Sequence, residues 1–152
     1  MAYWLLKSEP ETYAWEDLKR EPGRQTLWDG VRNYLARNRL KAMQVGDLAF
    51  FYHSGRQKAI MGIVRVVREA YPDPTQFDPA SPYRDPKSSP ENPRWVAVDV
   101  AWVRDFVPPI TLDELKARPE LADLELLQRG NRFSVQEVTP EQWRRICALR
   151  PD

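Results

Sequence analysis

Residues 28–38 read Trp28-Asp29-Gly30-Val31-Arg32-Asn33-Tyr34-Leu35-Ala36-Arg37-Asn38, which is too mixed a composition for a plain amphipathic helix. Gly30 permits a turn directly after Trp28 and Asp29, because glycine adopts positive φ angles readily. From Asn33 onward the spacing of apolar residues predicts a helix, and Asn33 itself suits its N-cap. The segment is therefore predicted to be a turn that leads into a helix.

Two interpretations of this segment remain open. In the first, the ring of Trp28, the cation of Arg32 and the free N–H groups of the first helical turn together hold an anion or a stacked ring. In the second, Trp28 is a core residue, and Arg32 and Arg37 belong to a solvated face. The sequence of these eleven residues does not separate the two.

Positive charge is concentrated around the same segment. The chain carries a net charge of +1, but residues 19–41 hold seven basic side chains against two acidic ones, a local balance of +5. The other residues must therefore sum to −4. A basic patch on an otherwise acidic chain favours local contacts to phosphate over binding to bulk nucleic acid.

Length and composition set limits on the class of protein. A chain of 152 residues with 42% hydrophobic residues fits one domain, residues 1–152. Cys147 is the one cysteine, which excludes an internal disulfide and a cysteine metal cluster and favours a reducing compartment. No apolar run is long enough for a signal peptide or a membrane span. We expect a cytoplasmic monomer that does not contact membranes.

The hydrophobic patterns predict a mixed sheet curled into a barrel, with short helices at its rim, in the α+β class. Strands are expected at residues 3–7, 48–52, 60–67, 95–103 and 133–136, with the first in the interior of the sheet. Helices are expected at residues 12–20 and 33–43 and after capping boxes at Thr111 and Thr139. Gly62 suggests a bulge or a close backbone approach.

Residues 72–93 contain seven prolines and almost no apolar periodicity. Loops of this length inside a compact domain are usually functional or disordered. Prolines lower the entropy that a loop loses when it is ordered. We therefore expect an ordered flap.

Signals for catalysis are weak. His53 is the one histidine, so metal sites that need two or three are excluded, and no nucleophile elbow, phosphate-binding glycine loop or dinucleotide motif is present. A hydrolase or nuclease would have to use His53 with Asp73 or Glu9. The alternative for His53 is a hydrogen-bonded residue at a strand end. We expect no enzyme activity, no cofactor and no metal.

Signals for binding are stronger. The chain has six tryptophans and six tyrosines, more large rings than a small core needs. Several lie beside polar groups at the ends of expected elements: Trp28, Tyr52 before His53-Ser54, Tyr71 before Pro72-Asp73, and Trp95. Rings in such places can stack on single-stranded or flipped bases while neighbouring polar groups read the base edge and hold phosphate.

Six motifs, in order over nearly the whole chain, resemble the EVE domain: residues 3–10, residues 28–34 with 36–38, residues 45–47 with 51–54, residues 62–64, residues 69–74, and residues 132–135 with 138–139. The resemblance implies a PUA-like fold related to the YTH and ASCH domains. It also implies a pocket that receives a modified base of DNA or RNA, and no catalytic residues. A small-molecule or protein-interaction module is a further, weaker hypothesis.

The resemblance also suggests roles for single residues. Lys7-Ser8 and Trp28 occupy the places that form part of an aromatic cage in YTH domains. Three residues are candidates for the second wall of the cage: Trp95, Tyr83 and Phe77. Leu35 stands where the family often has glutamine.

The predicted site follows from both lines of reasoning. Trp28 is expected to stack on the base. The edge of the base is expected to bind to Ser8, Asn33 and the backbone at Val31. Phosphates are expected to be held by Lys7, Arg32 and Arg37, and the pocket to be closed by His53-Ser54. Tyr52, Tyr71, Asp73 and Trp95 are further candidates. Trp28→Ala is expected to weaken binding at least about tenfold without unfolding the chain.

Overall fold

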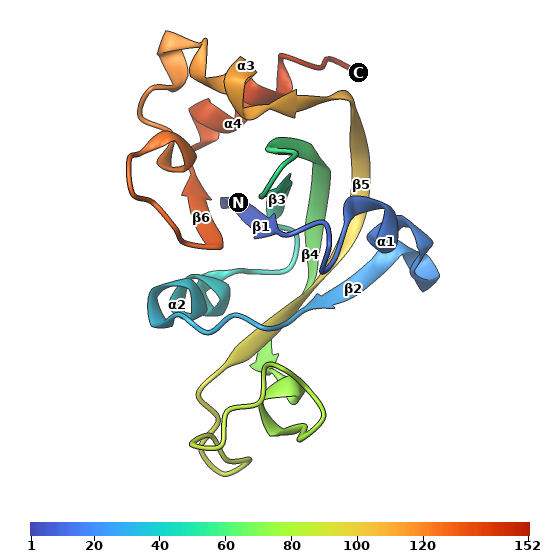
Figure 1. Cartoon of the computed structure of the whole chain (residues 1–152). Helices are drawn as coiled ribbons and strands as arrows, with labels where there is room; N and C mark the ends of the chain where they lie inside the picture. Colours follow the sequence, from blue (N-terminus) through green and yellow to red (C-terminus); the bar gives the residue numbers. More distant parts are fainter.

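The computed structural model describes residues 1–152 as one six-stranded mixed sheet with four short helices (Figure 1). The strands are β1 (Tyr3–Ser8), β2 (Gln25–Trp28), β3 (Leu48–His53), β4 (Ala59–Pro72), β5 (Val96–Thr111) and β6 (Val135–Val138). The helices are α1 (Trp15–Arg20), α2 (Tyr34–Ala42), α3 (Leu112–Lys116) and α4 (Pro140–Cys147). Short 3-10 turns cover Pro22–Arg24, Pro74–Phe77, Pro119–Leu121 and Glu125–Leu127.

The strand order is β2-β5-β4-β3-β1-β6. β1 and β3 are parallel, and every other pair is antiparallel. The predicted α+β class, the mixed sheet and the interior position of β1 are thus confirmed. β2 and β6 are the two edges and do not pair with each other, so the curled sheet is not closed into a barrel.

Two hydrophobic clusters form the core, and neighbouring residues of β3 belong to different ones. Ala49 and Phe51 lie in a cluster of 16 buried residues with Trp28, whereas Phe50 and Tyr52 lie in a cluster of 13. The division follows from the alternation of side chains between the two faces of a strand. Trp28 meets Phe51 edge to face, with ring centroids 5.4 Å apart. Trp28 is therefore a core residue.

Gly62 marks a close approach of elements, as expected. A Cβ atom at this position would lie 2.3 Å from the carbonyl oxygen of Arg104 and 2.4 Å from the ring of Trp15. The β3–β4 register shifts between Phe51 and Tyr52. Glycine is needed here because it lets α1 and β5 pack against β4.

The predicted helix caps are largely confirmed. The side chain of Asn33 accepts a hydrogen bond from the N–H of Ala36, and Thr139 forms a reciprocal capping box with Gln142. Thr111 caps α3, but the carboxylate of Glu114 binds Arg150 at 2.6 Å instead of returning to the cap, so that box is only half formed.

The sequence pattern misses β2 altogether. The strand does alternate, with Gln25 and Leu27 exposed and Trp28 buried, but apolar Leu27 lies on the exposed face, so the residue types do not show the alternation. Antiparallel pairing with β5 creates the strand, with Trp28 opposite Val98.

Four predicted boundaries also need correction. The strand expected at residues 60–67 continues as β4 to Pro72, which pairs with Val96 of β5. α1 begins at Trp15 and not at Thr12, and β6 begins two residues later than expected. β5 continues past the expected end to Thr111, which pairs with Ala59 at the start of β4. This extension depends on pairing with β4, and two consecutive prolines in its sequence hide it.

The buried side chain of Gln76 cross-links the flap, defined here as residues 72–93. The Gln76 amide donates to the carbonyl oxygens of Asp73 and Trp95, each at 2.8 Å. Its oxygen accepts from the hydroxyl of Ser88 and the N–H of Trp95. This network orders a segment that lacks helix or strand over most of its length and that lies at the lower end of Figure 1.

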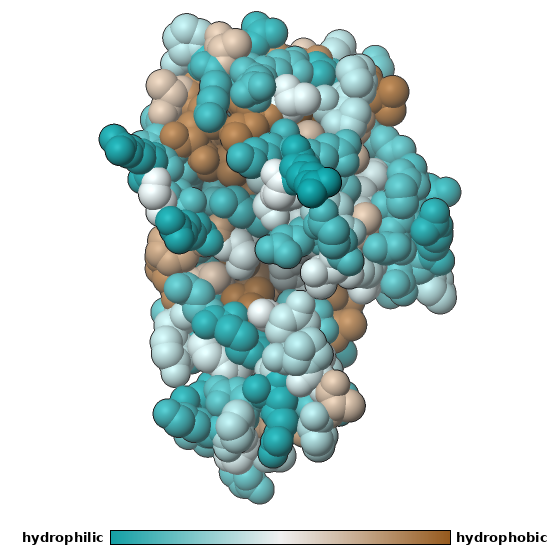
Figure 2. Space-filling view, viewed as in Figure 1, coloured by the Kyte–Doolittle hydropathy of each residue, from teal (hydrophilic) through white to brown (hydrophobic).

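The face of the molecule seen in Figure 2 is mainly hydrophilic, with apolar side chains showing between polar ones. None of the helices has the length and apolar character that crossing a membrane requires.

Candidate functional site

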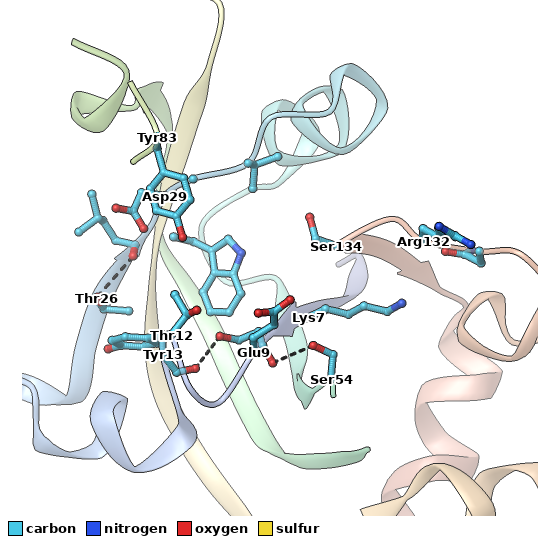
Figure 3. A pocket seen from close by; sticks show the side chains of 16 residues that line it. Lys7, Glu9, Thr12, Tyr13, Thr26, Asp29, Ser54, Tyr83, Arg132 and Ser134 are labelled. Atoms are coloured by element: carbon cyan, nitrogen blue, oxygen red, sulfur yellow. Dashed lines mark hydrogen bonds between the residues drawn. The ribbon is translucent and has the colours of Figure 1, made fainter. Parts of the chain in front are cut away.

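A cavity of about 770 Å³ opens where the end of β1, β2 and its following turn, the flap and the loop before β6 meet (Figure 3). Its volume is in the range of ligand pockets. Together with the segment that follows β1 and the end of β3, these parts of the chain supply the whole lining: Lys7, Ser8, Glu9, Thr12, Tyr13, Thr26, Leu27, Trp28, Asp29, Gly30, Val31, Ser54, Tyr83, Asn131, Arg132 and Ser134.

Two aromatic side chains of the lining, Trp28 and Tyr83, come from distant segments of the chain. Trp28 ends β2 and is 7% exposed, so that most of its ring is packed in the core. Tyr83 comes from the flap and packs directly over Gly30, where a Cβ atom would lie 2.8 Å from the tyrosine ring. Gly30 has a φ of +78°, which also disfavours other residues. Of the three residues considered for a second wall, Tyr83 is the one in the lining.

Arg32 holds Tyr83 in this position through the main chain. Its guanidinium donates to the carbonyl oxygen of Tyr83 at 2.6 and 3.0 Å, to Asp73 at 3.0 Å and to Thr75 at 3.1 Å. Asp73 is fully buried and also accepts from the N–H of Gly30 at 2.8 Å. Arg32 and Asp73 therefore join the 28–33 segment to the flap, and neither lines the cavity.

Two acidic side chains in the lining have no partner among the other residues. The carboxylates of Glu9 and Asp29 accept no hydrogen bond from another residue and form no ion pair. Burial, and then the nearby charge of Asp73, raise the pKa of Asp29 above its usual range, while Arg32 opposes this shift. Asp29 is thus a half-buried acceptor whose charge a ligand donor would stabilise.

Two basic side chains lie across the cavity from Asp29. Lys7 and Arg132 lie on the same side of the cavity (Figure 3). Burial lowers the pKa of Lys7, and the charge of Glu125 opposes the shift. Ser8 and Ser54 are also in the lining, and the hydroxyl of Ser8 donates to the carbonyl oxygen of Tyr13.

Several predicted site residues lie outside the cavity. Tyr52 is in the second core cluster, where burial raises its pKa to about 12. It faces away from the cavity because Phe51, its neighbour, faces the cluster of Trp28. The hydroxyl of Tyr71 donates to Asp99, and burial raises the pKa of Tyr71. Asn33 is occupied as the helix cap.

Trp95 and Arg37 both contact Tyr34, in the first turn of α2. Trp95 stacks on Tyr34 with ring centroids 4.8 Å apart and donates its indole N–H to Asp85. The guanidinium of Arg37 lies 4.7 Å from the centroid of the Tyr34 ring and donates to the carbonyl oxygen of Arg94. Neither Trp95 nor Arg37 lines the cavity.

His53 is a hydrogen-bonded residue at a strand end. It is 4% exposed, and its Nε2 accepts from the backbone N–H of Trp15 at 2.9 Å. A general base must reach the group that it deprotonates. His53 does not line the cavity, so it is not placed to act on a ligand there. No group of three or more His, Cys, Asp and Glu side chains is arranged to hold a metal ion.

The stability of the protein is expected to decrease as acidification protonates His53. Burial lowers its pKa from the ordinary value of 6.5. The unfolded chain therefore takes up the proton first, and the contribution of neutral His53 is complete above the unfolded pKa and is lost as the pH falls toward the folded pKa. Urea unfolding between about pH 8 and 5.5 should show this decline in the wild type and not in His53→Gln. An equal decline in both would contradict it.

Besides Tyr83, ten lining residues were not among the predicted site residues: Glu9, Thr12, Tyr13, Thr26, Leu27, Asp29, Gly30, Asn131, Arg132 and Ser134. The last three are far from Lys7 in the sequence. They reach the cavity because β6 pairs with β1, with Leu6 opposite Val135. The one sequence signal for Arg132 and Ser134 is their place in a segment that resembles the family.

An open, mixed sheet with a cavity at the end of β1 defines a PUA-like domain. The chain belongs to the EVE domain family, because the family model described as "EVE domain" matches residues 2–149. Thymocyte nuclear protein 1 of Rattus norvegicus is 44% identical over 165 aligned residues, which cover 97% of this chain and 73% of that protein.

Solved structures agree in fold. A protein from Pseudomonas putida is 52% identical, with a TM-score of 0.91 over 99% of this chain and 100% of its own. Human THYN1 protein, solved in complex with 5-methylcytosine-containing DNA, is 40% identical with a TM-score of 0.93, over 100% of this chain and 99% of that one. A mutant of ZmASCH from Zymomonas mobilis is 13% identical with a TM-score of 0.57, over 99% of this chain and 100% of that one, and shares the fold alone.

Proposed function

We propose that this protein binds DNA and accommodates one flipped 5-methylcytosine base in the cavity between Trp28 and Tyr83. The observation that carries the proposal is a cavity lined by the aromatic side chains of Trp28 and Tyr83, in a chain that is 40% identical to human THYN1, which was solved with 5-methylcytosine-containing DNA. No chemical step is part of this function.

The aromatic walls supply the main attraction for a base. Flipping a base out of a duplex costs a few kcal/mol, and stacking on an aromatic side chain returns about 1–3 kcal/mol per base. The 5-methyl group adds about 0.8 kcal/mol if it is fully buried, for example against Val31 or Leu27 of the lining. Burial of the methyl group alone therefore favours 5-methylcytosine over cytosine by about fourfold.

The unpartnered carboxylates suit the edge of a cytosine. The N4 amine of cytosine is a hydrogen-bond donor, and Asp and Glu are the side chains that accept from it. Asp29 lies beside Tyr83, and Glu9 lies nearer Lys7 (Figure 3). An amine in reach of Asp29 would also relieve its desolvated charge.

The test is a titration of DNA and RNA oligonucleotides by intrinsic tryptophan fluorescence. The target base would be cytosine, 5-methylcytosine, 5-hydroxymethylcytosine, adenine or N6-methyladenine in one fixed sequence. We expect DNA with 5-methylcytosine to bind at least about fourfold more tightly than the unmodified DNA. Equal affinity for all of these oligonucleotides would overturn the proposal, and a preference for an RNA base would correct its partner.

A further inference from the structure

The cavity has two sides of opposite charge. Lys7 and Arg132 lie on the side of β1 and β6, and Figure 3 shows Tyr83 and Asp29 together on the other side. Glu9 lies between them. A ligand that carries a negative group on one end and an amine on the other matches this division.

The pairing of β1 with the chain before β6 places Lys7 and Arg132 on the same side of the cavity. The backbone N–H of Lys7 donates to the carbonyl oxygen of Ser134 at 2.8 Å, and Arg132 lies two residues before Ser134. The sheet therefore places the segment that carries Arg132 beside the end of β1.

The side chains of Lys7 and Arg132 make no hydrogen bond or ion pair within the protein. The half-buried arginines Arg32, Arg39, Arg104 and Arg150, in contrast, are each paired with a carboxylate. Lys7 is half-buried, and the loss of hydration disfavours its charged form. An anion at this place would compensate for that loss.

We propose that Lys7 and Arg132 bind a backbone phosphate that flanks the inserted nucleotide, so that the DNA strand crosses the mouth of the cavity on the β1–β6 side. The inference rests on the proposed function and adds the position of the strand. The opposite side carries Asp29, whose negative charge would repel phosphate. The assignment differs from the one made from sequence, in which Arg32 and Arg37 shared this role with Lys7, because the guanidiniums of both are bonded within the protein.

The test removes charge from both partners. The DNA carries one 5-methylcytosine and one uncharged methylphosphonate linkage, placed directly 5′ or 3′ of that nucleotide. Wild type, Lys7→Met and Arg132→Gln are compared, and Arg145→Gln serves as the control because it removes an arginine of α4 that pairs with Glu141 outside the cavity. Circular dichroism and thermal unfolding verify that each variant is folded.

We expect one of the two uncharged linkages to weaken binding by wild type about tenfold and binding by Lys7→Met or Arg132→Gln by much less. With unaltered DNA, each of these variants should make the negative slope of log K against log salt less steep by about 0.9, whereas Arg145→Gln should leave the slope unchanged.

Two readouts separate this inference from the proposed function. If the uncharged linkages reduce the affinity of the variants as much as that of the wild type, Lys7 and Arg132 do not hold phosphate and the inference is wrong. The proposed function still stands in that case if the preference for 5-methylcytosine is retained. If the linkage effect depends on Lys7 and Arg132 but 5-methylcytosine and cytosine bind equally, the phosphate site stands and the base assignment fails.

Discussion

Trp28→Ala is expected to lower the free energy of unfolding by about 3–5 kcal/mol, because it empties a place in the core. Trp28 is 7% exposed and packs edge to face on Phe51. Folded domains have only about 5–15 kcal/mol of stability, so the variant should unfold at a much lower urea concentration than the wild type. The sequence alone led us to expect that this substitution leaves the fold intact, whereas the burial of Trp28 predicts that it destabilises the fold. A wild-type unfolding midpoint would show that Trp28 contributes little to the core.

Tyr83→Ala is the matched variant for binding. Tyr83 is half-buried and belongs to the flap, and its main chain, which Arg32 holds, stays in the variant. Loss of one stacking face should weaken binding of 5-methylcytosine DNA by about fivefold to hundredfold, with the unfolding free energy changed far less than in Trp28→Ala. Wild-type affinity in Tyr83→Ala would remove this ring from the binding site.

Asp73→Ala is expected to have the second large effect, a loss of about 3–5 kcal/mol in the free energy of unfolding, because it breaks a buried ion pair from one side. Arg32 would lose its carboxylate partner, and the N–H groups of Gly30 and Thr75 would lose their acceptor. Urea unfolding measures the loss, and hydrogen exchange of the flap amides shows whether the flap opens.

Asp99→Ala is the control for that experiment. Asp99 accepts from the hydroxyl of Tyr71, outside the cavity and the flap. Loss of this hydrogen bond should cost about 1 kcal/mol and leave exchange in the flap unchanged. If Asp73→Ala were as mild as Asp99→Ala, the ion pair with Arg32 would not be what holds the flap.

Features that depend on a few neighbouring residues could be predicted from the sequence. The cap at Asn33 needs a side chain and an N–H three residues away, and the strand that begins at Tyr3 shows its burial in an unbroken apolar run. A glycine inside an apolar run, such as Gly62, likewise indicates a close approach of another element. The sequence does not show that the neighbours are Arg104 and Trp15.

The errors in the predicted site concern contacts between distant residues. Arg32 stands four residues from Trp28, which suggests a free cation beside a ring, but its partner Asp73 lies 41 residues further along. Tyr52 follows a residue of the cavity-side core and points the other way, because strands alternate. Arg132 becomes a neighbour of Lys7 only through the pairing of β1 and β6.

The position of the base is tested most directly by NMR of DNA that carries 5-methylcytosine with a carbon-13-labelled methyl group. If the base lies between Trp28 and Tyr83, ring currents should shift the methyl resonance strongly on binding, and the shift should be much smaller in Tyr83→Ala. Nuclear Overhauser effects from the methyl group should reach protons of these rings. A methyl resonance that keeps its duplex position while the DNA is fully bound would contradict the account, because the base would then have remained in the stack.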